Sequence, residues 1–338
     1  MFFRRKKIAP PTLTLEGALG PNDRLDAAAA LAVPAPEAMC VADSALLLSS
    51  GNDLLRLAKW GDVPNLWHSF DAPITALASS AGGPVAVGLG SGLAVLDANG
   101  RQMTWASAQV SSIADLLFLS EDELAVVDPG YRPDQPVLSL APWDDVARGH
   151  VLGIRSSGEA RQIASGLHCP MGIVAGGGTL LITELDRARV LDTDGKVRQA
   201  GYPAYLGRLR KTAKGYALAC LSRRDPLIEF LKTEGEFVRL MKDTIAPHHW
   251  IAPRTTPEFT HDLPIALGAT RLYGAIKPWA PSFSYGLVIE LDADLMPIGS
   301  AHSRANGLRH AITDVCEWNG DLIAISRASG EILNLGVL

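Results

Sequence analysis

The sequence predicts an all-β fold, a six-bladed β-propeller. A short unit of apolar strand, polar turn and apolar strand recurs along the chain and is clearest at residues 36–57 and 311–335. Asn-Gly and Asp-Gly pairs, which accept the positive φ angles of tight hairpins, separate apolar runs near residues 100, 195 and 320. A length of 338 residues accommodates six units of about 40–50 residues each. Because one such unit cannot bury both of its faces, the copies are expected to stack around a common axis.

Six candidate blades can be placed along the chain. They begin near Pro36, Pro73, Ser112, Pro170, Tyr202 and Ala311. Runs such as 85–88 and 180–183 are nearly all apolar, which is typical of strands that neighbouring blades cover on both faces. We therefore assign residues 36–338 to the propeller and residues 1–35 to an N-terminal tail. Within this tail, residues 13–19 are the candidate for a strand that closes the ring by pairing with the last blade.

Two stretches interrupt the repeated unit. Residues 130–153 are rich in Pro and Asp and are predicted to form an enlarged loop. Residues 225–245 have helical character, because Asp225 can cap a helix that has Pro226 at its first position. Gly235 is expected to divide two short helices. We expect this insertion between the fifth and sixth blades, where it either covers one end of the channel or docks without a functional contact.

Composition and charge limit the partners and the location. The chain is 47% hydrophobic with a net charge of −5, so it lacks the basic surface that a nucleic-acid partner requires. The basic run at residues 4–7 is read as a solvated tail, because no apolar segment follows it as in a signal peptide. No stretch reaches the length of about 20 apolar residues that a membrane span needs. We therefore expect a cytoplasmic protein whose partner is a small molecule; the sequence does not determine its oligomeric state.

Three stretches carry a family resemblance. Residues 201–206, residues 227–253, and residues 285–292 with 311–320 resemble the strictosidine synthase-like family. That family is a branch of the six-bladed propellers that also include gluconolactonases, senescence marker proteins and paraoxonases. In its synthases, a glutamate on the last blade assists the condensation of an amine with an aldehyde, and Thr313 stands at that position. A threonine hydroxyl is not ionised near neutral pH and cannot replace that base, so true strictosidine synthesis is not expected.

The lactonase branch of this superfamily implies a calcium ion at the channel mouth. Glu37 matches the family's first-blade glutamate. Ala114, Met171 and Ala204 stand where relatives carry oxygen ligands. Because calcium takes about six to eight oxygen ligands, Glu37 and Asp115 alone would make a weak site. Calcium is therefore not the expected cofactor, and the sequence implies no other.

The candidate site lies at the blade entries that border the channel. His310 is the candidate base, aided by Asp314, with Thr313 beside them; a surface-loop histidine is the alternative for His310. The candidate ligand-binding residues are Glu37, Asp115, His168, Met171 and Tyr205. An inter-blade ion pair with a following arginine is expected at Glu184.

Two functions remain open. The resemblance implies a small-molecule enzyme, an ester or lactone hydrolase or a related condensing enzyme. The alternative is a non-catalytic propeller that binds a small molecule or acts as a scaffold. The alternative is supported because Ala114, Met171, Ala204 and Thr313 replace residues that carry chemistry in relatives.

Overall fold

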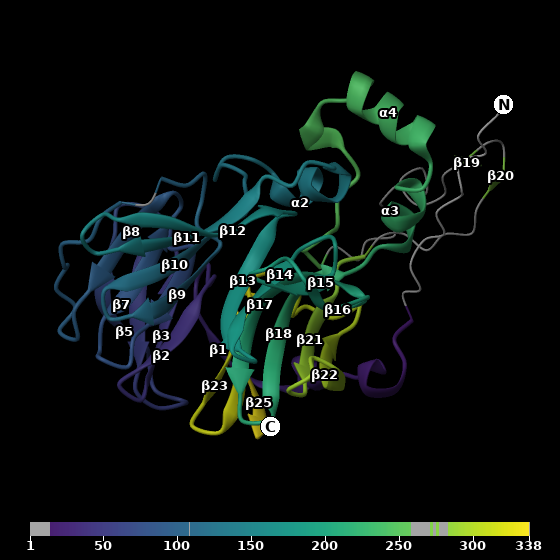
Figure 1. Ribbon diagram of the computed structural model, residues 1–338. Helices are drawn as coiled ribbons and strands as arrows, with labels where there is room; N and C mark the ends of the chain where they lie inside the picture. Colours follow the sequence, from purple (N-terminus) through teal and green to yellow (C-terminus); the bar gives the residue numbers. More distant parts are fainter. Residues whose placement is uncertain (1–13, 108, 258–270, 273–274, 277–282, 338) are drawn as a thin grey trace.

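The computed structural model confirms the six-bladed propeller (Figure 1). It describes residues 14–107, 109–257, 271–272, 275–276 and 283–337. Six antiparallel sheets contribute one innermost strand each, and every innermost strand contacts the next around the ring. The six predicted blade starts all lie at or just before an innermost strand.

The first three blades follow one another along the chain. Blade 1 contains β2 (Met39–Ala42), β3 (Ala45–Ser50), β4 (Asp53–Leu57) and β5 (Asn65–Ser69). Blade 2 contains β6 (Ala76–Ser79), β7 (Val85–Leu89) and β8 (Gly92–Leu96). Blade 3 contains β9 (Asp115–Ser120), β10 (Glu123–Asp128), β11 (Gly149–Arg155) and β12 (Ala160–Leu167).

The last three blades complete the ring. Blade 4 contains β13 (Pro170–Gly176), β14 (Thr179–Glu184), β15 (Arg189–Asp192) and β16 (Val197–Ala200). Blade 5 contains β17 (Ala204–Thr212), β18 (Gly215–Arg223), β21 (Gly286–Leu291) and β22 (Pro297–Ser303). Blade 6 contains β23 (Ile312–Trp318), β24 (Asp321–Ser326), β25 (Glu331–Val337) and β1 (Ala29–Ala32).

The strand that closes the ring comes from the N-terminal region, but not from the segment predicted. β1 pairs antiparallel with β25, with Ala29 opposite Asn334. Of the segment 13–19, residue 13 lies outside the described residues, and Gly17–Leu19 forms the short 3-10 helix η1. A four-residue helix, α1 (Arg24–Ala27), then leads into β1 and buries Leu25 completely. The chain therefore reaches blade 6 later than the sequence pattern indicated.

The helical insertion is present, but it lies inside blade 5. Asp225 caps α3 (Pro226–Leu231), as predicted, by accepting hydrogen bonds from the backbone N–H of Leu227 (2.8 Å) and Ile228 (3.4 Å). The second helix, α4 (Gly235–Thr244), begins at the predicted division. The 3-10 helix η3 (Pro247–His249) and the short strands β19 (Arg271–Leu272) and β20 (Ala275–Ile276) follow. Because β18 pairs with β21, the insertion joins the second and third strands of blade 5 rather than blades 5 and 6.

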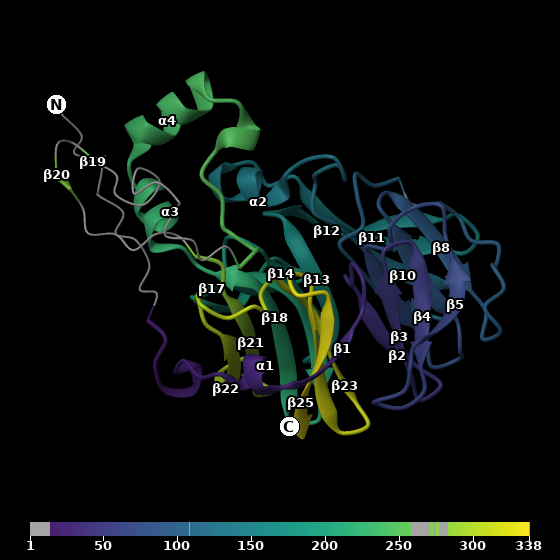
Figure 2. The same ribbon diagram turned by 180° about the vertical axis from the view of Figure 1, so that it is seen from behind.

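The enlarged loop predicted at residues 130–153 joins β10 to β11. It contains a short helix, α2 (Val137–Leu140), and the 3-10 helix η2 (Ala141–Trp143). Both views place α2, α3 and α4 at the same end of the molecule (Figures 1 and 2). This end of the propeller therefore carries the three helices, α2, α3 and α4, that could enclose a ligand.

The core consists of layers between neighbouring blades. One layer packs Leu46 and Leu48 of blade 1 against Ile323 and Ile325 of blade 6. Small residues let inner strands approach closely; a Cβ at Gly172 would lie 2.8 Å from the Cα of Arg208. In the described part of the chain, no helix is long and apolar enough to cross a membrane.

Candidate functional site

The channel axis is closed by one side chain, Arg208, which projects from β17 of blade 5. Its Nη1 donates to the backbone carbonyls of Glu37 (2.8 Å) and Thr313 (3.0 Å). Its Nη2 donates to the carbonyls of Ala114 (2.8 Å) and Thr75. These four acceptors belong to the entries of blades 1, 6, 3 and 2. The guanidinium is therefore a plug that joins five of the six blades.

A second ionic layer lies beside this plug. Arg210, two residues further along β17, contacts Asp115 at 2.7 and 2.8 Å and Asp314 at 3.1 Å. Both aspartates are fully buried. Each also accepts a backbone hydrogen bond from the next blade, Asp115 from Ile173 (2.9 Å) and Asp314 from Met39 (3.1 Å). Burial raises the pKa of Asp314, against the opposing effect of the Arg210 charge. These two predicted site residues thus fasten neighbouring blades together.

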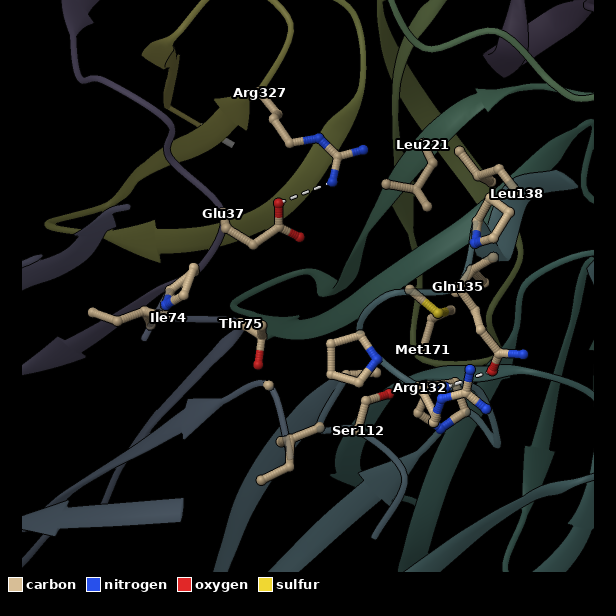
Figure 3. Close-up of a pocket in the computed structure, with 18 of the residues that line it drawn as sticks. Glu37, Ile74, Thr75, Ser112, Arg132, Gln135, Leu138, Met171, Leu221 and Arg327 are labelled. Atoms are coloured by element: carbon tan, nitrogen blue, oxygen red, sulfur yellow. Dashed lines mark hydrogen bonds and ion pairs between the residues drawn. The ribbon is translucent and has the colours of Figure 1, made fainter. Parts of the chain in front are cut away.

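A cavity of about 640 Å³ lies at the channel mouth, above the plug (Figure 3). Arg208, Thr75 and Ala114 form part of its floor. The loop between β10 and β11 forms one wall, with three prolines and α2. Its apolar lining residues include Ile74, Ile113, Val137, Leu138, Met171 and Leu221. Of the predicted site residues, Glu37 and Met171 line this cavity.

Glu37 is the one carboxylate among the described residues that line the cavity. Its Oε2 accepts a hydrogen bond from Arg327 Nη1 at 3.0 Å (Figure 3). Its backbone N–H donates to Ser49 Oγ (2.9 Å), which fixes the start of blade 1. Thr75 Oγ1 is buried at the floor and makes no hydrogen bond to any residue in the described ranges. The mouth therefore presents the Glu37–Arg327 pair in mainly apolar surroundings, with Ser112, Arg132, Gln135 and Ser139 as further polar lining residues.

His310 does not line the cavity. Its ring Nδ1 lies 2.7 Å from Ser284 Oγ and its Nε2 lies 2.9 Å from the carbonyl oxygen of Arg304. The residue is fully buried, so it is not the surface histidine of the alternative interpretation, and burial lowers its pKa. Thr313 is also buried, and its carbonyl is committed to the plug. The structure thus separates both residues from the cavity, and their catalytic role stays a prediction.

His168 and Tyr205 also lie outside the cavity lining. The backbone N–H of His168 donates to Glu184 Oε1 (2.7 Å), and burial lowers the pKa of the His168 ring. Tyr205 is fully buried in an apolar cluster. The ion pair expected at Glu184 forms with Arg189 at 2.5 Å, but both residues belong to blade 4, so it does not join two blades.

The residues at the mouth do not fit a calcium ion. Calcium requires several oxygen ligands, yet the side chains of Ala114 and Met171 supply none and Glu37 is engaged by Arg327. The Arg208 guanidinium already occupies the centre of the carbonyl ring, and its charge would repel a divalent cation. No cluster of three or more metal-ligating side chains occurs among the residues described.

Sequence reasoning missed Arg208 and Arg210, the two residues that organise the axis. A signal was present in the segment 204–212, where two arginines alternate with apolar residues on a strand predicted to be buried. Residues two apart face the same side of a strand, so both side chains were expected in the same buried environment. Buried charges require partners, and the aspartates at the entries of blades 3 and 6 were the available ones.

Of the comparisons with known proteins, the likeness to one solved structure supports the fold. No protein-family model matches the chain. No curated protein matches it either. A gluconolactonase from Xanthomonas campestris is similar over 97% of this chain and 95% of its own, with a TM-score of 0.53 and 12% identity. A structure of a nidogen/laminin complex is similar over 55% of this chain and 72% of its own, with a TM-score of 0.44 and 12% identity. The likeness to gluconolactonase shows the six-bladed propeller fold, whereas membership of the strictosidine synthase-like family is not specifically shown.

Proposed function

We propose that this protein binds a small molecule in the cavity at the channel mouth. The observation that carries the proposal is a cavity of about 640 Å³ whose floor is closed by Arg208. Ligand pockets are concave and mostly apolar, with a few polar groups that fix orientation, and this cavity has that character. Its prolines also hold one wall in a rigid conformation, so little ordering is needed on binding.

The lining defines the chemistry of the ligand. An apolar body fits between Ile113, Leu138 and Leu221. A guanidinium has five N–H donors, so Arg327 can bind a carbonyl or carboxylate of the ligand while it keeps its bond to Glu37. We therefore infer a mainly apolar molecule with one acceptor group.

Hydrolysis of an ester or lactone is the second candidate. It is supported by the position of Glu37 at the cavity and by the likeness of the fold to a gluconolactonase. In this reaction Glu37 would take a proton from water as the water oxygen adds to the ligand carbonyl carbon. The bond to the alkoxide leaving group would then break, and that group would receive the proton. Condensation of the strictosidine type is not proposed, because Thr313 is buried at the plug.

A screen of apolar carboxylic acids, esters and lactones by thermal shift tests both candidates. Leu138→Arg places a charge inside the cavity and should abolish the shift for true ligands. Leu308→Arg is the matched control, because Leu308 is 67% exposed and does not line the cavity. Binding without turnover supports the first candidate; turnover that Glu37→Gln abolishes while the ligand still binds supports the second. If every shift survives Leu138→Arg, the cavity is not the binding site.

A further inference from the structure

A chain of hydrogen bonds through His310 joins the helical insertion to the loop between blades 5 and 6. At one end, Ser284 Oγ lies 2.5 Å from the carbonyl oxygen of Thr256, which belongs to the insertion. The same Ser284 oxygen lies 2.7 Å from His310 Nδ1. At the other end, His310 Nε2 lies 2.9 Å from the carbonyl oxygen of Arg304. Ser284 directly precedes the return of the chain to β21, so the ring of His310 lies between the insertion and the propeller.

The two ends of this chain determine how many protons it needs. Both ends are backbone carbonyls, which only accept hydrogen bonds. The Ser284 hydroxyl has one proton, and this proton must point to the Thr256 carbonyl to make that contact. His310 Nδ1 must then donate to Ser284 Oγ, and His310 Nε2 must donate to the Arg304 carbonyl. Three contacts require three protons, and the ring supplies two of them only when it is charged.

A neutral His310 ring can keep two of the three contacts. With its proton on Nε2, the ring still donates to the Arg304 carbonyl, and Nδ1 accepts the proton of the Ser284 hydroxyl. The Thr256 carbonyl then loses its donor. Because Thr256 is exposed, water can replace the serine hydroxyl at this carbonyl. Loss of the second ring proton therefore opens the contact to the insertion.

The contact with Arg304 is the one retained, because the loop that carries it is fixed independently. Arg304 pairs with Asp23 at 2.9 Å. The Arg304 carbonyl also accepts a hydrogen bond from the backbone N–H of Gly307 (2.7 Å). A ring with its proton on Nδ1 alone would place two acceptors, Nε2 and this carbonyl, 2.9 Å apart with no proton between them.

The charges around the ring favour its protonation, whereas its burial opposes it. The charged residues of the surrounding elements are Asp23 and Asp26 at α1, Arg223 of β18, Arg304 and Arg309 of the loop, and Glu331 of β25. Arg309 pairs with Glu331 at 3.1 Å, as Arg304 does with Asp23, and the charge of Arg223 acts on Tyr285 and His302. Asp26 makes no ion pair with any residue in the described ranges.

Burial lowers the pKa of His310, and the Arg304 carbonyl and the charge of Asp26 act in the opposite direction. The net shift is downward from the usual 6.5, so the ring takes up its second proton in acid rather than at neutral pH.

We propose that this chain of hydrogen bonds is a proton-dependent clasp that holds the helical insertion on the propeller. When the ring of His310 gains its second proton, Nδ1 donates to Ser284 and the serine hydroxyl donates to Thr256, so the clasp closes. When the ring loses that proton, the hydroxyl turns back to Nδ1 and Thr256 is released. Acid closes the clasp, and a rise in pH opens it. This assignment does not depend on the function proposed for the channel-mouth cavity.

Nitrogen NMR of the histidine rings in the full-length protein tests the proton count. The signals of His310 are identified by their absence from His310→Gln. They should change from one protonated nitrogen to two as the pH falls from about 8 to about 5. Ser284→Ala removes the acceptor of the Nδ1 proton and should shift this transition to lower pH. A ring that stays neutral until the protein unfolds would overturn the proposal.

Hydrogen exchange with mass spectrometry tests the clasp itself. After correction for the intrinsic effect of pH, residues 246–256 should exchange about fivefold more slowly when the ring is charged, which corresponds to one added hydrogen bond. This gain in protection should follow the titration of the ring and should be absent from both His310→Gln and Ser284→Ala.

Ser300→Ala is the matched control for the exchange measurement. It removes a serine hydroxyl that lies 2.8 Å from another buried histidine ring, His302, and it should keep the wild-type response in residues 246–256. Protection that stays constant while His310 titrates, or that rises equally in Ser284→Ala, would show that the ring does not hold the insertion.

Discussion

At the residue scale, Arg208 shows why an arginine rather than a lysine closes the axis. The guanidinium is planar and presents its donors in a fixed fork, so one group can reach carbonyls that surround it. Its Nη1 and Nη2 serve four carbonyls from four blades. An ammonium has three donors on one nitrogen and cannot reach the same ring.

Replacing Arg208 should therefore destabilise the whole propeller. Arg208→Met leaves four buried carbonyls without donors and removes a charge that faces Asp115 and Asp314. Removing one partner of a buried ionic network costs about 3–5 kcal/mol, and we expect a loss of that order in urea unfolding. Arg56→Met, at an exposed site on β4, is the control and should unfold like the wild type. A wild-type midpoint for Arg208→Met would show that the plug does not hold the blades together.

The buried ring of His302 predicts how stability depends on pH. It contacts Tyr285 Oη (3.0 Å) and Ser300 Oγ (2.8 Å), and burial lowers its pKa from the usual 6.5 to about 4. Between these values the unfolded chain binds a proton that the folded protein does not, so acidification favours unfolding. The protein should lose about 3 kcal/mol of stability from this group as pH falls from 6.5 to 4.

Urea unfolding at several pH values measures this loss. His302→Gln should flatten the dependence, whereas His68→Gln, on the outer strand β5, should leave it unchanged. If both variants follow the wild-type curve, the acid sensitivity has another source.

At the scale of elements, the closing strand β1 was predicted in kind but not in position. Residues 29–32 are three alanines and a leucine, which carry little intrinsic preference for a strand. They become a strand because β25 offers an unpaired edge, with Leu31 opposite Ile332. A pairing between residues so far apart in sequence leaves no local pattern to recognise.

Breaking this pairing should weaken the ring. Leu31→Pro removes a backbone N–H on the side of the strand that faces β25, because Val33, two residues further along, donates to Gly330 on that side. We expect a loss of about 1–2 kcal/mol, measured as a lower melting temperature in calorimetry. Leu31→Val is the matched control, because it shortens the same side chain but keeps the N–H and is compatible with a strand. Equal melting of Leu31→Pro and Leu31→Val would mean that the pairing of β1 does not contribute to closure.

The helical insertion also shows which features the sequence could predict and which it could not. Its helices could be predicted because their signals are local, namely the Asp225 cap and the following proline. Its place inside blade 5 depends on the pairing of β18 with β21, with Leu218 opposite Ile289. Such long-range pairing depends on packing between strands that are distant in sequence. The sequence alone therefore placed the insertion between blades 5 and 6, whereas it lies inside blade 5.

At the scale of the whole molecule, the repeated unit predicted which residues lie near the channel mouth better than it predicted where their side chains point. Repetition fixes the ring, and the ring brings the blade entries together, so Glu37 and Met171 do lie at the cavity. Asp115 and Asp314 also lie near the axis, but they face arginines of another blade. His310 belongs to an entry loop as predicted, yet its ring turns into the protein toward Ser284. Blade periodicity locates a residue on the ring, whereas the direction of its side chain depends on contacts between blades.

The plug also predicts how the molecule responds to divalent cations. In wild-type protein the Arg208 guanidinium supplies the positive charge at the centre of the carbonyl ring. A chelator should therefore leave the melting temperature unchanged, and added calcium should not raise it. Arg208→Ala removes that charge and leaves the carbonyls near Asp115 and Asp314, so calcium should partly restore the stability that this variant loses. Magnesium is the matched control, because its small octahedral shell suits a ring of fixed carbonyls poorly. A fall in wild-type melting temperature on chelation, reversed by calcium, would show that a metal ion and not the arginine completes the axis.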